Sequence, residues 1–283
     1  MSENKNVDKK VVSGFGDEWS RFDQSALEED ERGNIFHSYF AIFPWDKIDS
    51  SSEGFDMGCG SGRWAEVVAA KVGQLNCIDP SSEALEVAKN KLRNFSNCSF
   101  FNESVDSLPF PNNSQDFGYS LGVIHHIPDM QEAINCCVKK LKTGAPFLIY
   151  CYYSFDNRPF WYRWLWLITN FFRVIISRTP SKIRYLISQA FALCVYLPIA
   201  RSIKLLKKMG FDLQTLPLYF YHDKSFYTMR TDALDRFGTR LEHRLSRLEL
   251  EDLMKFAGLE NISFSENAPF WCAVGYKRCT EHI

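Results

Sequence analysis

The hydrophobic and polar positions of the 283-residue chain follow a regular rhythm from residue 54 onward. Short apolar runs at 54–57, 74–79, 98–102, 117–121 and 147–153 predict strands. Between them, apolar residues recur every three to four positions and predict helices at 64–72, 82–92 and 130–141. This alternation favours a doubly wound, mostly parallel α/β sheet, because parallel neighbours need a crossover helix.

The rhythm stops at residues 154–240, which hold long aromatic and aliphatic helical stretches with proline stops at Pro180 and Pro198. It returns with a helix over 246–257 and two strands over 259–265 and 271–277. We therefore expect a Rossmann-like sheet of about seven strands with a helical insertion before its last helix and strand pair. The expected divisions are a flexible tail over 1–13, N-terminal helices and the sheet core over 14–153, the insertion over 154–240 and the end of the core over 241–283.

Composition and charge narrow the classes of protein to consider. The formal net charge is −1, so the whole chain has no electrostatic bias toward nucleic acid. The nine cysteines, an odd number without a CxxC pair, favour reduced, buried thiols and show no zinc-site spacing. The first ten residues are polar and charged and lack the apolar core of a signal peptide. We expect a cytoplasmic protein without a metal site.

A glycine-rich segment, DMGCGSG at 56–62, ends the first predicted strand and opens the first predicted helix. Glycines allow a sharp turn and the close approach of a ligand, and a helix N-terminus offers amide hydrogens to an anionic group. Asp79 ends the next strand, where a carboxylate can accept hydrogen bonds from both hydroxyls of a ribose. Together these features predict a site for a nucleoside-containing cofactor.

Three interpretations of this segment compete: a methyl-donor site, a dinucleotide site and a turn that binds nothing. The glycines follow GxGxG instead of GxGxxG, and an acid, Asp56, precedes the first of them. A carboxylate at that point suits the ammonium of a methionine group and would repel a pyrophosphate. These two details favour the methyl donor.

Four motifs in order, DMGCGSG, CIDPSSEALEVAKN, SVDSLPFPNNSQDFGYS and LGVIHHIPD, resemble the class I S-adenosylmethionine-dependent methyltransferases, especially their small-molecule branch. The resemblance covers 54–153 closely and implies S-adenosyl-L-methionine as cofactor and S-adenosyl-L-homocysteine as product. It also implies that Asp79 holds the ribose and that Ser104 and Val105 lie beside the adenine, where the family often has Asp in place of Ser104. The cofactor residues that we expect are Asp56, Gly58, Gly60, Gly62, Asp79, Pro80, Ser104, Val105, Leu121, Gly122 and, on a helix folded over the cofactor, Trp19.

Residues suited to catalysis follow the fourth and fifth predicted strands, at the edge where open α/β sheets bind ligands. His125 and His126 are suited to general base catalysis near neutral pH, or they only shape the site. Tyr152 and Tyr153 contact substrate or pack in the core. The catalytic candidates are His126, His125 and Tyr152.

The insertion is basic and aromatic. Between residues 151 and 210 it carries ten Lys or Arg and a single acid, Asp156, which gives a net charge of +9. Such a segment suits a solvated lid, an anionic membrane surface, an amphiphilic phosphate-bearing substrate such as a lipid phosphate, or an acidic protein partner, and it contains no recognised nucleic-acid-binding module. Residues 219–244 are dense in Tyr, His, Asp and Arg and form either an acceptor pocket or a structural hairpin. The expected substrate residues are His222, Tyr227, Arg230 and Tyr153.

The sequence thus predicts an S-adenosylmethionine-dependent methyltransferase with a small-molecule acceptor or a lipid- or glycan-linked one. Two alternatives stay open: a cofactor-binding module or membrane-surface scaffold without catalysis, and an NAD-dependent oxidoreductase. The expected partners are the acceptor and an anionic membrane surface contacted by residues 158–208, which would hold the protein at the inner face of the membrane. Nucleic acid is not an expected partner.

Overall fold

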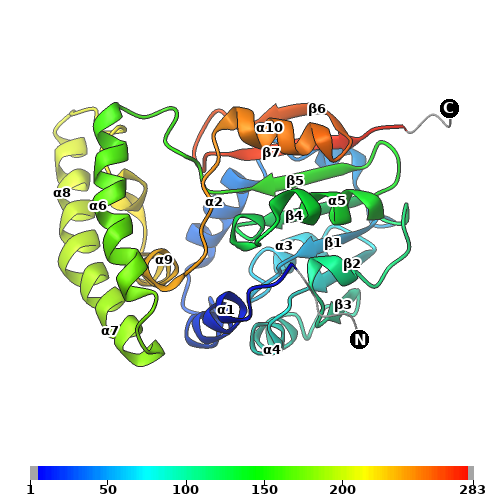
Figure 1. Ribbon diagram of the computed structural model, residues 1–283, viewed down its shortest axis with the longest axis horizontal. Coiled ribbons are helices and arrows are strands. Elements are labelled where there is room, and N and C mark those ends of the chain that lie inside the picture. The colour runs from blue at the N-terminus through cyan, green and yellow to red at the C-terminus, as the bar shows by residue number, and fades with distance from the viewer. Residues whose placement is uncertain (1–5, 280–283) are drawn as a thin grey trace. The chain divides into compact units, whose positions relative to one another are not determined.

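A computed structural model describes residues 6–279 of the chain (Figure 1). The chain divides into two compact units. One, the sheet unit, comprises Met1–Asp23, Asn34–Ser154 and Leu241–Ile283, and the other, the helical unit, comprises Gln24–Gly33 and Phe155–Arg240. The helical unit begins one residue after the expected start of the insertion and also takes in the segment 24–33, which no sequence signal marked.

The sheet unit contains seven strands in the order β3-β2-β1-β4-β5-β7-β6. Their bounds are β1 Glu53–Met57, β2 Gln74–Ile78, β3 Cys98–Phe101, β4 Phe117–Leu121, β5 Pro146–Tyr150, β6 Leu259–Phe264 and β7 Cys272–Lys277. The first five strands are parallel, and β7 runs antiparallel to both of its neighbours, β5 and β6. The expected Rossmann-like α/β fold is confirmed.

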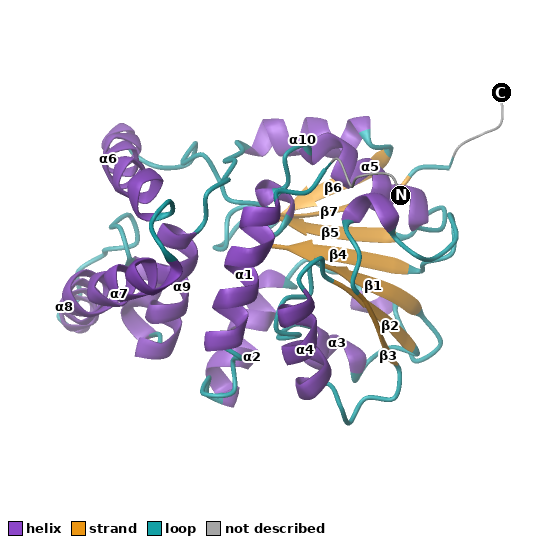
Figure 2. Ribbon diagram, turned by 60° about the horizontal axis from the view of Figure 1, so that its bottom comes forward, coloured by secondary structure: helices purple, strands orange, loops and turns teal. Residues whose placement is uncertain are grey.

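Helices cover both faces of this sheet (Figure 2). They are α1 Lys9–Arg21, α3 Ala65–Ala69, α4 Ser82–Lys91, α5 Met130–Lys140 and α10 Arg247–Phe256, with α2 Glu29–Tyr39 crossing the division between the units. Polar side chains fix several helix starts: Ser81 caps α4, Asp129 caps α5, and Ser246 forms a capping box with Glu249 on α10.

The side chains of each strand alternate between two hydrophobic cores. Phe55 and Phe147 point to the core that contains residues of α5 and α10. Tyr119 and Leu148 point to the opposite core, which contains residues of α2, α3 and α4. Because both faces are covered, β1, β2, β4 and β5 are almost continuously buried, as is expected of the central strands of a parallel sheet.

The N-terminal region differs from the expectation of a tail over residues 1–13. Helix α1 begins at Lys9, and the Asp8 carboxylate accepts hydrogen bonds from the Lys10 and Val11 amides at 2.8 and 3.2 Å. This cap satisfies amide groups that would otherwise lack partners at the helix start, so the helix extends well before Gly14. The prediction was therefore wrong for residues 6–13, while residues 1–5 lie outside the described part of the chain.

The helical unit is built around α9 Phe226–Gly238. Its other helices are α6 Phe160–Ile176, α7 Ser181–Phe191, a π-helical turn Ala192–Tyr196, α8 Leu197–Lys208 and a 3-10 turn Tyr219–Asp223. Met229 and Ala233 of α9 share a core with Ile176 of α6 and Ala200 of α8. Pro180 precedes α7 as expected, but Pro198 does not end a helix. It lies at the start of α8, directly after the π-helical turn, and the helix continues through it from Ser181 to Lys208.

Candidate active site

The glycine-rich loop is tied to the sheet by its own backbone. The amides of Gly58 and Cys59 both donate to the Ile78 carbonyl, at 2.8 and 3.0 Å, so the loop after β1 leans against the end of β2. Gly58 and Gly60 have φ angles of +80° and +53°, which favour glycine. A Cβ at Gly60 would lie 2.9 Å from the indole nitrogen of Trp19, so helix α1 approaches the loop too closely for a side chain.

A cavity of about 120 Å³ lies between this loop, the ends of β2 and β4 and helix α1. Nine of the eleven predicted cofactor residues line it. They are Trp19, Gly58, Gly60, Asp79, Pro80, Ser104, Val105, Leu121 and Gly122. Five segments that are distant in sequence therefore converge on one enclosed space, which is the usual architecture of a small-molecule site.

Asp79, at the end of β2, is one of the titratable groups that line this cavity. Its two carboxylate oxygens accept hydrogen bonds from the Gly60 amide at 2.9 Å and the Ser81 amide at 2.8 Å. Burial raises the pKa of Asp79 to about 6, although both backbone bonds act in the opposite direction. The carboxylate is therefore ionised at neutral pH, fixed in orientation, and left with lone pairs that can accept hydrogen bonds from ligand hydroxyls.

The other two predicted cofactor residues do not line the cavity. Asp56 is buried within β1, and burial raises its pKa to about 8 although the Tyr119 hydroxyl acts to lower it. Asp56 is therefore mostly protonated at pH 7, and its expected attraction for an ammonium group stays a prediction. Gly62 has a φ of +74°, and a Cβ there would lie 3.2 Å from that of Ala88, so this glycine permits close packing against α4.

The two adjacent histidines have different surroundings. His126 lines the cavity, its ring centroid lies 5.0 Å from that of Phe15, and its Nδ1 lies 2.6 Å from the Leu241 carbonyl oxygen. His125 lies outside the cavity lining and is fully buried, and this burial holds its pKa well below the usual range. Its ring centroid is 4.0 Å from that of Tyr152, which also lies outside the lining. Of the three catalytic candidates, His126 therefore lines the cavity, whereas His125 and Tyr152 pack against each other outside the lining.

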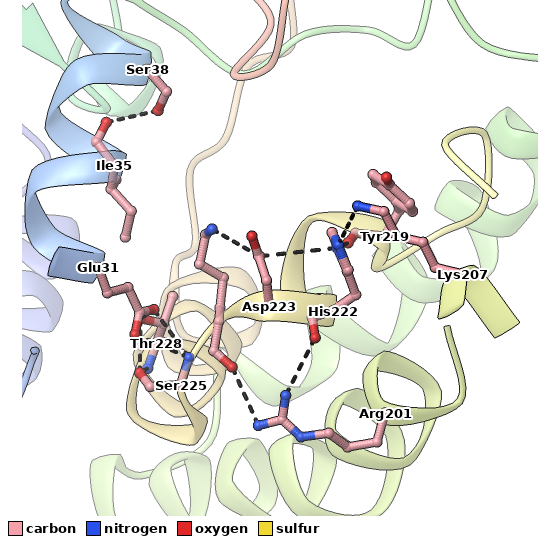
Figure 3. A network of polar contacts seen from close by, with 11 residues as sticks. Glu31, Ile35, Ser38, Arg201, Lys207, Tyr219, His222, Asp223, Ser225 and Thr228 are labelled. Carbon is pink, nitrogen blue, oxygen red and sulfur yellow. Dashed lines mark hydrogen bonds and ion pairs between the residues drawn. The ribbon is translucent and has the colours of Figure 1, made fainter. Parts of the chain in front are cut away.

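None of the four predicted substrate residues is among the residues that line the cavity. In the helical unit, His222 is held between Tyr219 and Lys207: its Nδ1 lies 2.7 Å from the Tyr219 carbonyl oxygen and its Nε2 accepts from Lys207 at 2.9 Å (Figure 3). Tyr227 accepts a hydrogen bond from the Gln24 amide at 2.9 Å.

Arg230 and Tyr153 are also engaged in structural contacts. Arg230 donates to Gln189 at 2.6 Å and to the Tyr185 hydroxyl at 2.9 Å within the helical unit. Tyr153, in the sheet unit, pairs with Leu245 in an isolated bridge. The polar groups of His222, Tyr227 and Arg230 thus bond to partners within the helical unit, which favours a structural role over an acceptor pocket.

Two further residues line the cavity that the sequence did not mark. Arg63 follows the glycine loop, with its guanidinium 4.0 Å from the centroid of the Trp64 ring. Asn6 anchors the segment before α1: its side-chain amide donates to the Asp129 carbonyl at 2.8 Å and accepts from the Asp129 amide at 2.7 Å. The Asn6 backbone amide also donates to the Asp106 carboxylate at 3.1 Å. The position of Arg63 just before a predicted helix could have marked it, whereas no sequence motif around Asn6 indicates its role.

The lining suits a nucleoside ligand that also carries charged groups of both signs. It offers a fixed carboxylate at Asp79, a cation at Arg63, polar and apolar contacts at Ser104 and Val105, and a glycine backbone without side chains. No group of three or more His, Cys, Asp or Glu side chains suited to a metal ion occurs among residues 6–279. All nine cysteines are free thiols.

Comparison with known proteins identifies the class. Residues 55–149 match the family model described as "Methyltransferase domain". The chain is 24% identical over 196 residues to a demethylmenaquinone methyltransferase of Tropheryma whipplei, which covers 66% of this chain and 81% of that protein. It is 29% identical over 105 residues to the ubiquinone biosynthesis O-methyltransferase of Serratia proteamaculans, covering 36% of this chain and 42% of that protein.

A solved structure shows the same fold. A chain in the complex between the Haloferax volcanii Trm112 methyltransferase activator and a methyltransferase superposes with a TM-score of 0.55 at 14% identity, covering 93% of this chain and 98% of that one. The segment that matches the family model holds the glycine loop, Asp79 and His126. Residues 55–149 are therefore a methyltransferase domain, within a chain that has the class I S-adenosylmethionine-dependent methyltransferase fold.

Proposed function

We propose that this enzyme methylates a small, largely apolar acceptor at an atom that must first lose a proton, and that His126 takes this proton. The observation that carries the proposal is the position of His126: it lines the same cavity as the cofactor loop, while its Nδ1 is held by the Leu241 carbonyl at 2.6 Å. A carbonyl accepts only from N–H, so the neutral ring carries its proton on Nδ1 and its lone pair on Nε2. That tautomer is the one a general base needs.

The cofactor supplies an activated methyl group on a sulfonium when it is bound. The chain's part is to hold that group and the acceptor in line, since alignment is the main catalytic contribution in such a transfer. Asp79 would accept hydrogen bonds from the ribose hydroxyls, Ser104 and Val105 would contact the adenine, and Arg63 would face the methionine carboxylate. Trp19 of α1 would cover the bound cofactor and limit its contact with water.

The acceptor class is supported by the lining and by the relatives. Val11, Val12, Phe15, Val123 and Ile127 add apolar surface to the same cavity as His126. The relatives are named for demethylmenaquinone and ubiquinone biosynthesis, and quinones and their reduced hydroxyl forms have an apolar body. A reduced quinone-like acceptor, free or linked to a lipid or glycan, would bring an acidic hydroxyl or ring carbon to His126.

Turnover by purified protein tests the proposal. We expect methyl transfer to a panel of hydroquinones and phenols, and a loss of roughly 100-fold in kcat for His126→Gln with cofactor affinity kept. The matched control is His37→Gln, because His37 is exposed on α2 and outside the cavity lining.

Each contrary result has a distinct meaning. Equal kcat in the His126→Gln variant and the wild type would refute the base. Binding of S-adenosylhomocysteine with no turnover on any acceptor class would favour the non-catalytic module. Binding of NAD in place of S-adenosylhomocysteine would favour the oxidoreductase.

A further inference from the structure

Helix α6 presents its apolar side to solvent. Phe160, Trp164, Ile168, Phe171 and Ile175 recur every three to four residues, so they share one side of the helix. Their exposed fractions range from 51% for Ile175 to 80% for Phe160. Of the nineteen large apolar side chains that are exposed among the described residues, seventeen lie between 160 and 211, so apolar exposure is a specific property of this part of the chain.

The opposite side of α6 is less exposed and carries polar side chains, Thr169, Asn170 and Arg173, beside the buried Ile176. Arg173 is buried, and its guanidinium donates to the carbonyls of Thr239 and Arg240 at 2.7 and 3.2 Å and to the Asn170 side chain at 2.8 Å. Arg236 of α9 donates to the Thr169 hydroxyl at 3.4 Å. A helix on a water-exposed surface normally has the reverse arrangement. The inversion indicates that the outer side of α6 meets an apolar environment.

The helix from Ser181 to Lys208 continues this character. It is 28 residues long, has a mean hydropathy of 1.5 over its most apolar window, and by length and composition alone could cross a membrane. Its inner side, however, packs into the core around α9 and includes the bond between Gln189 and Arg230. Its outer side exposes Leu186 and Leu205. Since one side is committed to the helical unit, the helix is suited to lying along a surface and not to spanning a bilayer.

Charge identifies the kind of surface. The ten Lys or Arg of residues 151–210 face a single acid, and Arg163, Arg178, Lys182 and Lys204 are exposed beside the apolar side chains. A second copy of the chain would bring the same exposed cations against this surface, which is unfavourable. Anionic lipid headgroups would neutralise the cations while the aromatic and aliphatic side chains enter the boundary with the acyl chains.

We propose that the outer sides of α6 and of the 181–208 helix form a docking surface for an anionic lipid bilayer. We call it the lipid-docking surface, and Trp164, Phe171, Leu186 and Leu205 are its most exposed anchors beside Phe160. Docking there would hold the enzyme at a membrane that contains apolar acceptors. The inference does not depend on the identity of the acceptor or on His126.

Vesicle sedimentation with the full chain tests this surface directly. The probes are vesicles of phosphatidylcholine with and without phosphatidylglycerol. We expect binding to the anionic vesicles, and roughly tenfold or greater loss of the partition coefficient for the double variant Trp164→Ser/Phe171→Ser. The matched control is Leu248→Ser/Phe256→Ser on α10, whose 70% and 78% exposure compares with 66% and 63% for Trp164 and Phe171.

A charge variant separates the two contributions. Arg163→Gln/Lys182→Gln should lose about fivefold per cation on anionic vesicles, and added salt should weaken wild-type binding. Circular dichroism and S-adenosylhomocysteine affinity should stay at wild-type values in all variants, which separates this test from that of the catalytic proposal. Three results would overturn the proposal: no wild-type binding to either vesicle, equal loss in the α10 control, or an apolar variant that only abolishes self-association.

Discussion

Replacing Asp79 by Asn tests the cofactor site at its best-defined group. The wild-type carboxylate accepts one backbone amide on each oxygen, from Gly60 at 2.9 Å and from Ser81 at 2.8 Å. In the Asn variant the side-chain NH2 must replace one of these oxygens, so one backbone donor meets another donor. The variant keeps the size of the side chain but loses a backbone hydrogen bond and the charge that strengthens the bonds to a ribose.

The magnitude follows from these bonds. A hydrogen bond to a charged acceptor contributes about 1.5–3 kcal/mol, and the variant weakens or removes at least one such bond to the cofactor. We therefore expect the affinity for S-adenosylhomocysteine to fall about 10- to 100-fold, since about 1.4 kcal/mol corresponds to a factor of ten. The lost backbone bond should also lower the stability of the unliganded protein by about 1 kcal/mol.

The pH dependence gives an independent signature. Burial raises the pKa of Asp79 to about 6 in the unliganded protein. Ribose hydroxyls donate to the ionised form, so binding must displace a proton below this pKa. The wild-type affinity should be level above pH 6 and fall by up to about tenfold per pH unit below it, because one proton is linked to binding. The Asn variant has no such proton and should show a level profile.

Isothermal titration calorimetry with S-adenosylhomocysteine between pH 5 and pH 8, in buffers of different ionisation enthalpy, measures both the affinity and the proton released. The reasoning fails if the wild type shows a level profile through pH 6, or if Asp79→Asn binds as tightly as the wild type at pH 8.

Three further predictions concern neighbouring features. Asp56→Asn should stabilise the protein above neutral pH. Folding raises the pKa of the Asp56 carboxyl from 3.8 to about 8, so the wild type should lose on the order of 5 kcal/mol of its free energy of unfolding between pH 4 and pH 8. Denaturant melts of both proteins at the two pH values would show whether the variant escapes this loss. Gly60→Ala should weaken S-adenosylhomocysteine binding, because the new Cβ would lie 2.9 Å from the Trp19 indole nitrogen. The control is Gly14→Ala on α1, where nothing lies within 4 Å of the new Cβ. This control should leave the affinity intact and stabilise the protein by up to about 1 kcal/mol. Asn6→Ala removes two hydrogen bonds to Asp129 that hold the segment before α1. The dissociation rate of S-adenosylhomocysteine, measured by stopped flow, should rise roughly tenfold. An unchanged rate would show that this anchor does not retain α1 over the cofactor.

The core of the fold was predictable because its signals are local. The strand expected at 117–121 is β4, and the helices expected at 82–92 and 130–141 are α4 and α5 to within one residue at their ends. Each is bounded by a cap or a turn that the sequence displays, such as Ser81 and Asp129. The helix expected at 64–72 is shorter, since its last turn takes 3-10 geometry with Lys71 donating to the Val68 carbonyl.

The site was predictable only where side-chain type sufficed. Asp79 and Ser104 line the cavity as their places after β2 and β3 suggested. The contacts of Asn6, by contrast, reach residues 100 and 123 positions away, and no periodicity or spacing encodes them. His222 and Arg230 looked suitable for an acceptor because of their chemistry, but their polar groups bond within the helical unit.

The charge of the cofactor site shows how burial changes the meaning of a motif. Of the two carboxyls that the sequence offered, Asp56 is mostly protonated at neutral pH and Asp79 is ionised, because only Asp79 receives two backbone hydrogen bonds beside its burial. The acidic residues of the cavity wall are then Asp79 and Asp8, and the basic residue is Arg63. Asp79 ends β2, where a carboxylate suits the ribose of a methyl donor and of a dinucleotide alike, so its charge does not distinguish the two cofactors. Burial therefore decides which acid carries charge at neutral pH: the carboxylate that would meet a ribose is the residue that ends β2, and not the acid that precedes the glycines.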